Sequence, residues 1–469
     1  MTRWKYLIKC VKEFCLQTNI NGFNHIAMPR RHWLERVLWV LISGSAIWGV
    51  VEVSLGQFQR YNENPTVVTL EKDFRSWRFA LPGVTICDQD RVNPEKMVQV
   101  IKKHWQVKPG DNKYAYYSRF VTTVANSDLF HLDGYQEFMH DEELDVDLYQ
   151  LTIDVSPEQQ VKTTWSRDIT AKWTPVMTEA GVCYSINSVA TADVAINNTG
   201  IVTFDPFTCK YSSLSCYVMF ESPKPIDIYV HSPYDIMELT SLVSRTFLTL
   251  NRITELSVME TRTGREVRIL RPQRRRCLYN DEPMGKDRQV YSTNTCRLSC
   301  RIKLALQLCG CRPFYYFYAE SKPCDVAGMW CLAGHSQQLA NFGGVRCVCN
   351  QQCVDAVFRE ISIVDQLWDR GPFQNRAAVR FTVQAPRTRY TREIVFHFED
   401  LVVSFGGAAG LFLGASFISF VEIFYFILDK IIKAFQKKSN IMVARSFKNG
   451  NRIMVKSRIN LRKSQFRLN

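Results

Sequence analysis

Three consecutive small residues, Gly414-Ala415-Ser416, lie near the middle of the longest apolar stretch of this sequence, residues 401–428. A backbone that opens at such a place offers carbonyl oxygens and a hydroxyl group, which can replace part of the hydration shell of a cation. Irregular backbone is tolerated at membrane depth only where it lines a water-filled path or is buried in protein. The residue types therefore favour ion coordination over covalent chemistry.

The apolar stretch must position this triple. As one straight helix its 28 residues would reach about 42 Å, beyond the ~30 Å hydrocarbon core of a membrane, so we expect the helix to tilt or to break. A break is favoured because small residues, which let helices of several subunits approach along an axis, surround the triple. A tight dimer of two helices that pack through small residues four positions apart would also explain these small residues. The small residues are Gly406, Gly407, Ala408, Ala409, Gly410, Gly414, Ala415, Ser416 and Ser419, and the single charge of the stretch is Glu422.

A second candidate span lies near the N-terminus. Residues 34–55 are predominantly apolar and long enough to cross the hydrocarbon core if Glu35, Arg36 and Glu52 lie at its edges or face protein. A signal peptide is the alternative, but the stretch follows a long basic leader and no small-residue cleavage pattern comes after it. We therefore expect a signal anchor.

Positive charge is concentrated at the two ends. The 469 residues carry a net charge of +14, with 12 Lys/Arg and no Asp/Glu in residues 430–469, and seven Lys/Arg against two Glu in residues 1–36. Residues 37–429 are close to neutral, with 40 basic and 43 acidic side chains, which argues against nucleic acid as a partner. Two basic ends around a neutral middle indicate cytosolic termini. A mean hydropathy of −0.16 and 46% hydrophobic residues exclude a disordered chain and a transporter with many spans.

Fourteen of the 16 cysteines lie between the two candidate spans, from Cys87 to Cys353, whereas Cys10 and Cys15 precede the first span. This even number predicts seven disulfides in an oxidising compartment, although spacing alone leaves their connectivity open. Zinc is the alternative at the C-x-C pairs 309–311 and 347–349, but no His lies at ligand spacing near them.

The segment between the spans predicts one extracellular α+β body without repeats or linkers. Short β-branched runs between turn residues predict strands at 67–70, 81–87, 184–186, 226–229 and 379–383. In residues 296–309 the apolar spacings of three and four predict a helix with one buried face, on which Cys296 and Cys300 stand one turn apart. The sequon that begins at Asn197 predicts glycosylation.

Enzyme motifs are absent from the sequence. It contains no G-x-S-x-G, P-loop, H-E-x-x-H or dinucleotide-binding glycine motif, and its eight His are scattered. The acidic residues between Asp141 and Asp147 could bind cations or protons, but a solvated acidic loop is the preferred interpretation. Residues 271–276 could be a protease site, and a basic loop is preferred there. We expect no enzyme activity, no metal site and no cofactor.

Several motifs together resemble the degenerin and epithelial sodium channel family, most of all its insect pickpocket branch. Gly406-Gly-x-x-Gly-Leu-Phe-x-Gly-Ala-Ser416 followed by Val421-Glu422 is similar to the family's pore helix, whose G-x-S triple is its selectivity filter. Residues 81–87 resemble its F-P-x-V-T-I-C strand, and residues 181–187 its G-x-C-Y-x-F-N motif. Tyr291-Ser292 before Cys296, Cys300, Cys309 and Cys311 matches its thumb helix. The resemblance covers about residues 15–430.

The resemblance implies a trimer of two-span subunits, each with a hand-like ectodomain of palm, β-ball, finger, thumb and knuckle. The fold class is then a membrane α+β protein, with a cytoplasmic segment 1–33, helices at 34–55 and 401–428, an extracellular domain 56–400 and a cytoplasmic tail 429–469. The implied disulfides are Cys87–Cys183, Cys277–Cys353, Cys296–Cys349, Cys300–Cys347, Cys309–Cys331 and Cys311–Cys324, with Cys209–Cys216 left as the seventh.

Three departures from the family's pattern concern the finger and the gate. Members usually have a further cysteine pair just before the G-x-C-Y motif, in a C-x-W context, where Thr163-Thr164-Trp165 stands here without cysteine, so the finger is built differently. The family's cytosolic His-Gly gating motif is Asn21-Gly22 here. The degenerin site, where members carry a small residue, holds Val403, followed by Ser404. A stiff β-branched side chain at this site should hold three pore helices apart and favour the open state.

The implied function is a subunit of a sodium-selective, amiloride-sensitive, non-voltage-gated channel of the plasma membrane, gated by a ligand or by force, with a sensory or ion-transport role. Sodium is its permeant ion, and the implied filter is Gly414, Ala415 and Ser416. Gly406, Gly407, Gly410 and Glu422 would line the pore or pack helices. The expected partners are membrane lipid and related subunits in a homo- or heterotrimer, and the extracellular ligand is unknown. The alternatives are a subunit that conducts only in heteromers, and a two-span scavenger-type receptor, which would not need a glycine-rich second span.

Overall fold

The computed structural model describes residues 3–29, 31–166, 172–196, 205–212, 216–239, 241, 243–282, 288–368 and 375–448. Two compact units make up the chain: residues 1–63 with 396–469, and residues 64–395. Asn197, the predicted glycosylation site, lies outside the described residues.

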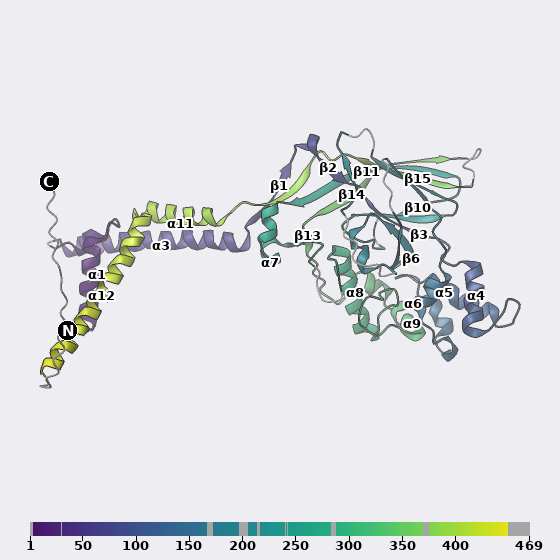
Figure 1. Ribbon diagram of the computed structural model, residues 1–469, viewed down its shortest axis with the longest axis horizontal. Coiled ribbons are helices and arrows are strands. Elements are labelled where there is room, and N and C mark those ends of the chain that lie inside the picture. Colours follow the sequence, from purple (N-terminus) through teal and green to yellow (C-terminus); the bar gives the residue numbers. More distant parts are fainter. Residues whose placement is uncertain are drawn as a thin grey trace. The chain divides into compact units, whose positions relative to one another are not determined.

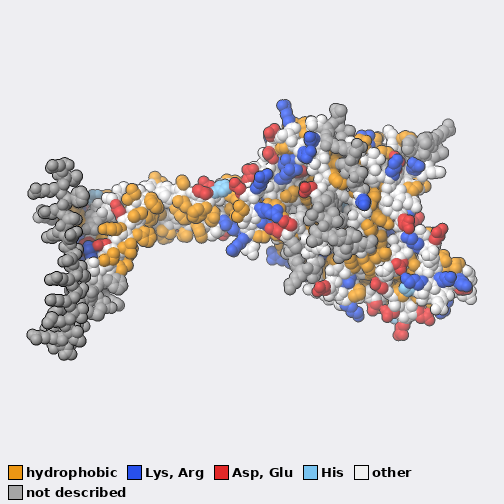
Figure 2. Space-filling model, in the orientation of Figure 1, with side chains coloured by type: hydrophobic (Ala, Val, Ile, Leu, Met, Phe, Trp, Pro, Cys, Tyr) orange, Lys and Arg blue, Asp and Glu red, His pale blue; other side chains and the backbone are white. Residues whose placement is uncertain are grey.

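Helices form the described part of the first unit. They are α1 (Arg3–Gln17), α2 (Phe23–Ala27), α3 (Trp33–Glu63), α11 (Phe398–Leu413) and α12 (Phe417–Lys448). α3 and α11 run side by side, and apolar side chains stay exposed along both (Figures 1 and 2). An exposed apolar surface on paired helices is typical of helices that face lipid.

The two predicted spans differ in continuity. α3 contains residues 34–55, continues to Glu63, and is the one described helix that is long and apolar enough to cross a membrane by itself. α11 and the residues Phe417–Lys433 of α12 pass the same test only as a pair, bent by 82° at residues 414–416. The apolar stretch 401–428 is therefore broken at its small-residue triple.

A seven-stranded sheet is the largest sheet of the second unit. Its strands are β1 (Thr66–Glu71), β4 (Lys162–Trp165), β8 (Tyr217–Ser222), β11 (Leu250–Thr263), β14 (Asp355–Leu367), β15 (Ala377–Gln384) and β16 (Arg389–Ile394). Their order is β1-β16-β11-β15-β8-β4, and β14 also pairs with β11. The long strand β11 runs antiparallel to β14 and parallel to β15 and β16, which pair with successive parts of it.

A five-stranded sheet has the order β10-β9-β3-β6-β5. Its strands are β3 (Gly83–Asp88), β5 (Thr174–Thr178), β6 (Gly181–Ile186), β9 (Ile226–His231) and β10 (Val243–Arg245), and the short pairs are β2 (Arg78–Ala80) with β7 (Thr208–Lys210) and β12 (Cys277–Leu278) with β13 (Gln351–Gln352). All five predicted strands are confirmed, but β3 begins two residues late. Pro82 has no N–H, and Leu81 donates instead to the carbonyl of Phe207 at 2.8 Å.

Side chains from both sheets, such as Val84, Phe220 and Phe381, form one apolar core, and the helices of this unit share another. The α-helices are α4 (Pro94–Trp105), α5 (Tyr114–Ala125), α6 (Leu148–Val155), α7 (Pro272–Arg275), α8 (Thr293–Cys309), α9 (Val326–Ala333) and α10 (Ser336–Ala340). The 3₁₀ segments are η1 (Phe74–Ser76), η2 (Asp133–Phe138), η3 (Glu142–Leu144), η4 (Val189–Asp193) and η5 (Arg265–Ile269).

The predicted helix at 296–309 is confirmed as α8. A capping box of Ser292 and Thr295 begins it, and Gly310 ends it in the left-handed conformation. Its buried face includes Leu298, Ile302 and Ala305, as predicted, and also Arg301, whose burial no local pattern indicates.

The prediction of a basic loop at residues 271–276 is wrong, because Pro272–Arg275 form the short helix α7. Pro272 stands at the first position of α7, where its missing N–H costs nothing, and the short helix turns Arg275 inward. Arg275 is 1% exposed and forms an ion pair with Glu282. In the acidic segment, Asp141 and Asp147 cap η3 and α6, which accounts for two of its carboxylates.

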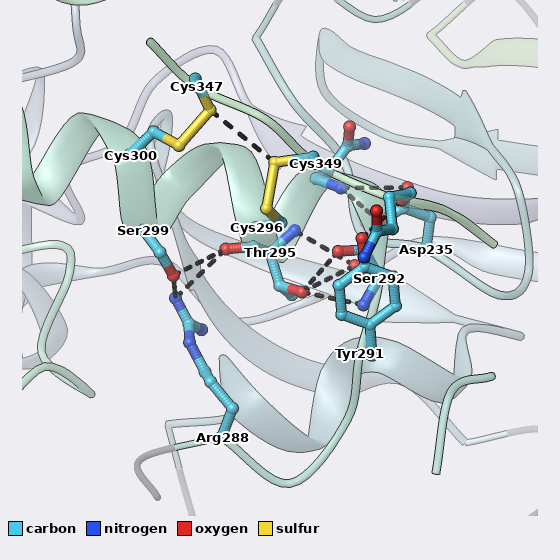
Figure 3. Close-up of a disulfide and its surroundings, with 12 residues drawn as sticks. Asp235, Arg288, Tyr291, Ser292, Thr295, Cys296, Ser299, Cys300, Cys347 and Cys349 are labelled. Carbon is cyan, nitrogen blue, oxygen red and sulfur yellow. Dashed lines mark hydrogen bonds between the residues drawn. A yellow bond between two sulfur atoms is a disulfide. The ribbon is translucent and has the colours of Figure 1, made fainter. Parts of the chain in front are cut away.

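Seven disulfides cross-link the second unit: Cys87–Cys183, Cys209–Cys216, Cys277–Cys353, Cys296–Cys349, Cys300–Cys347, Cys309–Cys331 and Cys311–Cys324. Two of them join neighbouring turns of α8 to residues 347–349 (Figure 3). Cys10 and Cys15 in α1 stay unpaired.

Candidate functional site

The break between α11 and α12 is built around Gly414. This residue has φ +61°, a left-handed conformation that costs a residue with a Cβ about 1–2 kcal/mol. The N–H groups of Gly414 and Ala415 donate to the carbonyls of Gly410 (3.0 Å) and Ala409 (3.2 Å), so the end of α11 is satisfied. Ala415 is buried, whereas Gly414 and Ser416 are exposed in the single chain.

Ser416 stands directly before α12. Its carbonyl accepts the N–H of Ser419 (2.9 Å), and its own N–H donates to the Ser419 hydroxyl (3.2 Å). Ser419 is 4% exposed. Ser416 is therefore fixed as the residue that starts α12, and its hydroxyl, on an exposed residue, lies 3.5 Å from the Ser419 hydroxyl.

The N-terminal segment between α1 and α2 packs against this break. The Asn21 N–H donates to the carbonyl of Leu413, the last residue of α11, at 3.0 Å. A Cβ on Gly414 would overlap the Asn21 side-chain amide. Gly22 has φ +90°, and a Cβ there would lie 2.9 Å from the Ser43 hydroxyl of α3. Asn21-Gly22 therefore fits between α3 and the broken helix.

Two polar contacts tie α1 and the segment that follows it to α12. Asn19 Nδ2 donates to Glu422 Oε1 at 2.8 Å, while Glu422 Oε2 is covered and has no hydrogen-bond partner among the described residues. Further along, Glu13 of α1 forms an ion pair with Lys430. The interaction of Glu422 is thus with the N-terminal segment of its own chain.

One face of α11 makes little contact within the chain. Val403 is 71% exposed, and in the described structure nothing lies within 4 Å of a Cβ added at Gly406 or Gly407. The opposite face buries Leu401, Ala408 and Ala409. The exposed face therefore consists of Val403 followed by glycines, and it ends at the break.

The structure brings together Asn21, Gly22, Gly414 and Ala415, and joins Glu422 to them through Asn19. Val403 and Ser404 lie in α11, apart from this contact. Sequence reasoning missed Asn19 and Ser43. Asn19 and Glu422 are 403 residues apart, so no local spacing rule could have paired them. The arrangement offers exposed backbone and a hydroxyl at a break in an apolar helix, which suits a passing cation.

Comparisons with known proteins agree with this chemistry. A family model described as amiloride-sensitive sodium channel matches residues 14–426. The sodium channel protein Nach of Drosophila virilis is 26% identical over 196 residues, which cover 38% of this chain and 51% of that protein. Pickpocket protein 28 of Drosophila melanogaster is 24% identical over 184 residues, which cover 34% of this chain and 30% of that protein. The chain therefore spans about half the length of these relatives or less.

A solved structure of a proton-activated chloride channel aligns with 83% of this chain and 96% of its own, at 7% identity and a TM-score of 0.28, which is too weak a likeness to carry an argument. The family match, in contrast, extends over most of the chain and includes both Asn21 and Glu422. The chain therefore belongs to the amiloride-sensitive sodium channel family, the degenerin and epithelial sodium channels, and is similar to its insect Nach and pickpocket members.

Proposed function

We propose that this chain is a subunit of a sodium-preferring, non-voltage-gated cation channel, with the pore narrowest at Gly414-Ala415-Ser416. The observation that carries the proposal is the face of α11 that starts at Val403, continues through glycines without intrachain contacts, and ends at a backbone break. A face of small residues that stays uncovered in one chain suits close approach of equivalent helices from other subunits.

Three copies of the break around one axis would form a ring of carbonyl and hydroxyl oxygens. Such a ring replaces part of the hydration shell of an ion, and its narrowness favours a small cation over a larger one. Family membership supports sodium as this ion, and it supports block by amiloride.

In this proposal both termini are cytosolic and the second unit is extracellular, in a homo- or heterotrimer in the plasma membrane. The basic ends of the chain and the seven disulfides of the second unit support this topology. It is tested by terminal tags, which should be labelled only after cells are permeabilised, and by Asn197→Gln, which should remove a glycosidase-sensitive mass. A tag labelled on intact cells would refute the topology.

We assign the control of opening and closing to two sites in the chain. Asn21-Gly22 would hold the filter from the cytosolic side, because it contacts Leu413 and Gly414. Val403 and Ser404 would set how closely the pore helices approach above the filter. An extracellular ligand or mechanical force would act on these places.

The test of the proposal is the reversal potential in sodium and potassium after expression in oocytes, alone and with related subunits. Ser416→Cys and Ser416→Asp should change the sodium to potassium ratio, whereas Ser45→Cys, at an exposed serine of α3, should not. Unchanged ratios in a conducting trimer would refute the role of Ser416. Current only in mixtures would identify a subunit that conducts only in heteromers, and ligand uptake without current in every mixture would favour a receptor.

A further inference from the structure

A cavity of about 460 Å³ lies beside α8 in the second unit. Three cationic side chains from three segments line it: Arg288 before the helix, Lys303 on the helix, and Arg346 next to the disulfide-linked residues 347–349. Among the described residues, none of those that line the cavity is an Asp or a Glu. The cavity is therefore a place of concentrated positive charge.

Arg288 is held in place by neutral groups, and among the described residues it forms no ion pair within 4 Å. Its Nη2 donates to the Ser299 hydroxyl at 3.2 Å and to the carbonyl of Thr295 at 3.5 Å (Figure 3). Its guanidinium lies 3.8 Å from the centre of the Tyr318 ring. Nη1 is covered, and in the described part of the chain it has no hydrogen-bond partner. A half-buried cation with an unsatisfied donor favours an anion nearby.

The carboxylate of Asp193 does not serve as that anion. Burial raises the pKa of Asp193, and the positive charge of Arg288 opposes that rise. The carboxylate oxygens, however, accept the backbone N–H groups of Gln289 (2.7 Å) and Val290 (3.4 Å). Asp193 therefore fixes the backbone that carries Arg288, and its carboxylate makes no hydrogen bond to the guanidinium in the part of the chain that the structure describes.

The other two cations are brought together by a covalent bond. Cys300 stands three residues before Lys303, Cys347 directly follows Arg346, and the two cysteines form a disulfide with 5.9 Å between their Cα atoms. Both cations are exposed, and neither forms an ion pair within the described residues. The disulfide thus holds two like charges near each other, and a bound anion would offset their repulsion.

We propose that this cavity binds a small anion with two charged oxygen groups, such as a diphosphate or a dicarboxylate. Its volume lies within the usual range for small-molecule sites and far exceeds the space of a single halide ion. Arginines bind carboxylate and phosphate groups through two parallel hydrogen bonds, so exposed Arg346 would hold one end of the ligand, and Arg288 would contribute its positive charge at the other. Val290, Val345 and Val348 supply the apolar wall.

The experiment measures binding to the full chain in detergent micelles, in a chloride-free buffer of low ionic strength. Calorimetric titration with pyrophosphate should show saturable binding. Arg346→Gln and Lys303→Gln should each weaken it about tenfold, since loss of one charge-assisted contact is worth about that factor. Arg346→Lys keeps the charge but loses the two parallel hydrogen bonds, so it should bind more weakly than the unchanged chain and more tightly than Arg346→Gln. Succinate in place of pyrophosphate distinguishes a carboxylate ligand from a phosphate ligand.

The control is Arg271→Gln, which removes one exposed cation that does not line the cavity. If all single-charge variants reduce the affinity equally, or if pyrophosphate does not bind, the proposal is overturned. It is also overturned if chloride alone saturates the site and excludes pyrophosphate. Arg288→Gln is tested last, because Arg288 is half-buried and its loss could disturb folding. The readout is binding, so its outcome is independent of whether the chain conducts ions.

Discussion

The side-chain amide of Asn21 fills the space beside the α-carbon of Gly414, so that no side chain fits at position 414 while Asn21 stays where it is. The two residues are joined through the backbone as well, because Asn21 donates to the carbonyl of Leu413. Whatever moves the N-terminal segment therefore acts directly on the break between α11 and α12.

Gly414→Ala should reduce current strongly at equal surface expression, because the added methyl group is strained at φ +61° and overlaps Asn21. Asn21→Gly in the same chain should restore part of the current, since it removes the overlap and leaves only the strain. Gly44→Ala is the matched control, because a Cβ at Gly44 meets no described atom within 4 Å. A double variant no better than Gly414→Ala would mean that the overlap is not the cause.

Loss of the Asn19–Glu422 hydrogen bond should loosen α1. Cys15 is 7% exposed in α1 and reports on this motion through its rate of reaction with a thiol reagent, in a Cys10→Ser background. Glu422→Ala should raise the rate about threefold, as expected for the loss of one hydrogen bond worth about 0.7 kcal/mol. Glu422→Gln keeps an acceptor for Asn19 and should leave the rate unchanged. Equal rates in both variants would show that the contact does not hold the segment.

Val403→Ser should reduce basal current. In a trimer the exposed, β-branched Val403 would crowd the closed state, and a penalty of about 1.4 kcal/mol would shift the open-to-closed ratio tenfold. Asn21→His, which restores the family's residue, should raise the current. Val402→Ser changes the neighbouring valine on another face of α11 and is the control. If Val403→Ser leaves basal current unchanged, the gate lies elsewhere or a partner subunit sets it.

Ionisation of the buried Asp235 carboxyl should lower the free energy of unfolding of the second unit as the pH rises. Burial raises the pKa of this carboxyl to about 7 from 3.8, and nearby Asp355 adds to the shift, against hydrogen bonds from Ser292, Ile236 and Asn294. The unfolded carboxyl ionises near pH 4 and the folded one near pH 7, so stability is lost across that window as the pH rises.

Asp235→Asn should therefore flatten the dependence of the melting temperature on pH between about pH 4 and pH 7, because the amide keeps an acceptor and does not ionise. Part of the slope should remain, because burial also raises the pKa of Asp355. Asp133→Asn, at an exposed position, is the control. A profile parallel to that of the unchanged chain would contradict the burial of an ionisable Asp235.

Arg301 should be essential for the stability of the second unit. It is 1% exposed and donates to Glu179 (2.6 Å) and to Glu238 (2.7 Å), so Arg301→Gln would leave buried Glu179 without a cation and buried Glu238 with Arg297 alone. The expected cost is about 3–5 kcal/mol, measured by denaturant unfolding of the full chain in detergent. Arg119→Gln breaks an exposed ion pair with Glu137 and should have no measurable effect. Comparable losses in the two variants would refute the central role of the buried cluster.

Helices and strands that depend on local sequence patterns could be predicted from the sequence. The strands at 67–70 and 379–383 were visible because β-branched residues favour extended backbone, and α8 because its apolar spacing matches a helical turn. The break at Gly414 followed from length and from residue size. In each case the residues that form the predictive pattern lie within about 30 residues of the strand, helix or break that they predict.

Contacts between distant parts of the chain could not be predicted in this way. Arginine is usually exposed, so nothing local indicates that Arg301 and Arg275 are buried, and each is inside because of carboxylates presented by the fold. Cysteine spacing likewise permits many pairings. The resemblance to a family, not the spacing, supplied the pairs that the structure also contains.

The strand order of the large sheet also determines when this protein can fold. β1 pairs with β16, and the bond from the Thr69 hydroxyl to the Thr391 carbonyl joins residues 322 apart. A ribosome needs roughly 15–60 s to add that many residues, and during this time β1 has no partner for its exposed Val67, Val68 and Leu70. The first effect of a damaging substitution in β16 would therefore be on how many chains leave the site of synthesis, before any current is measured.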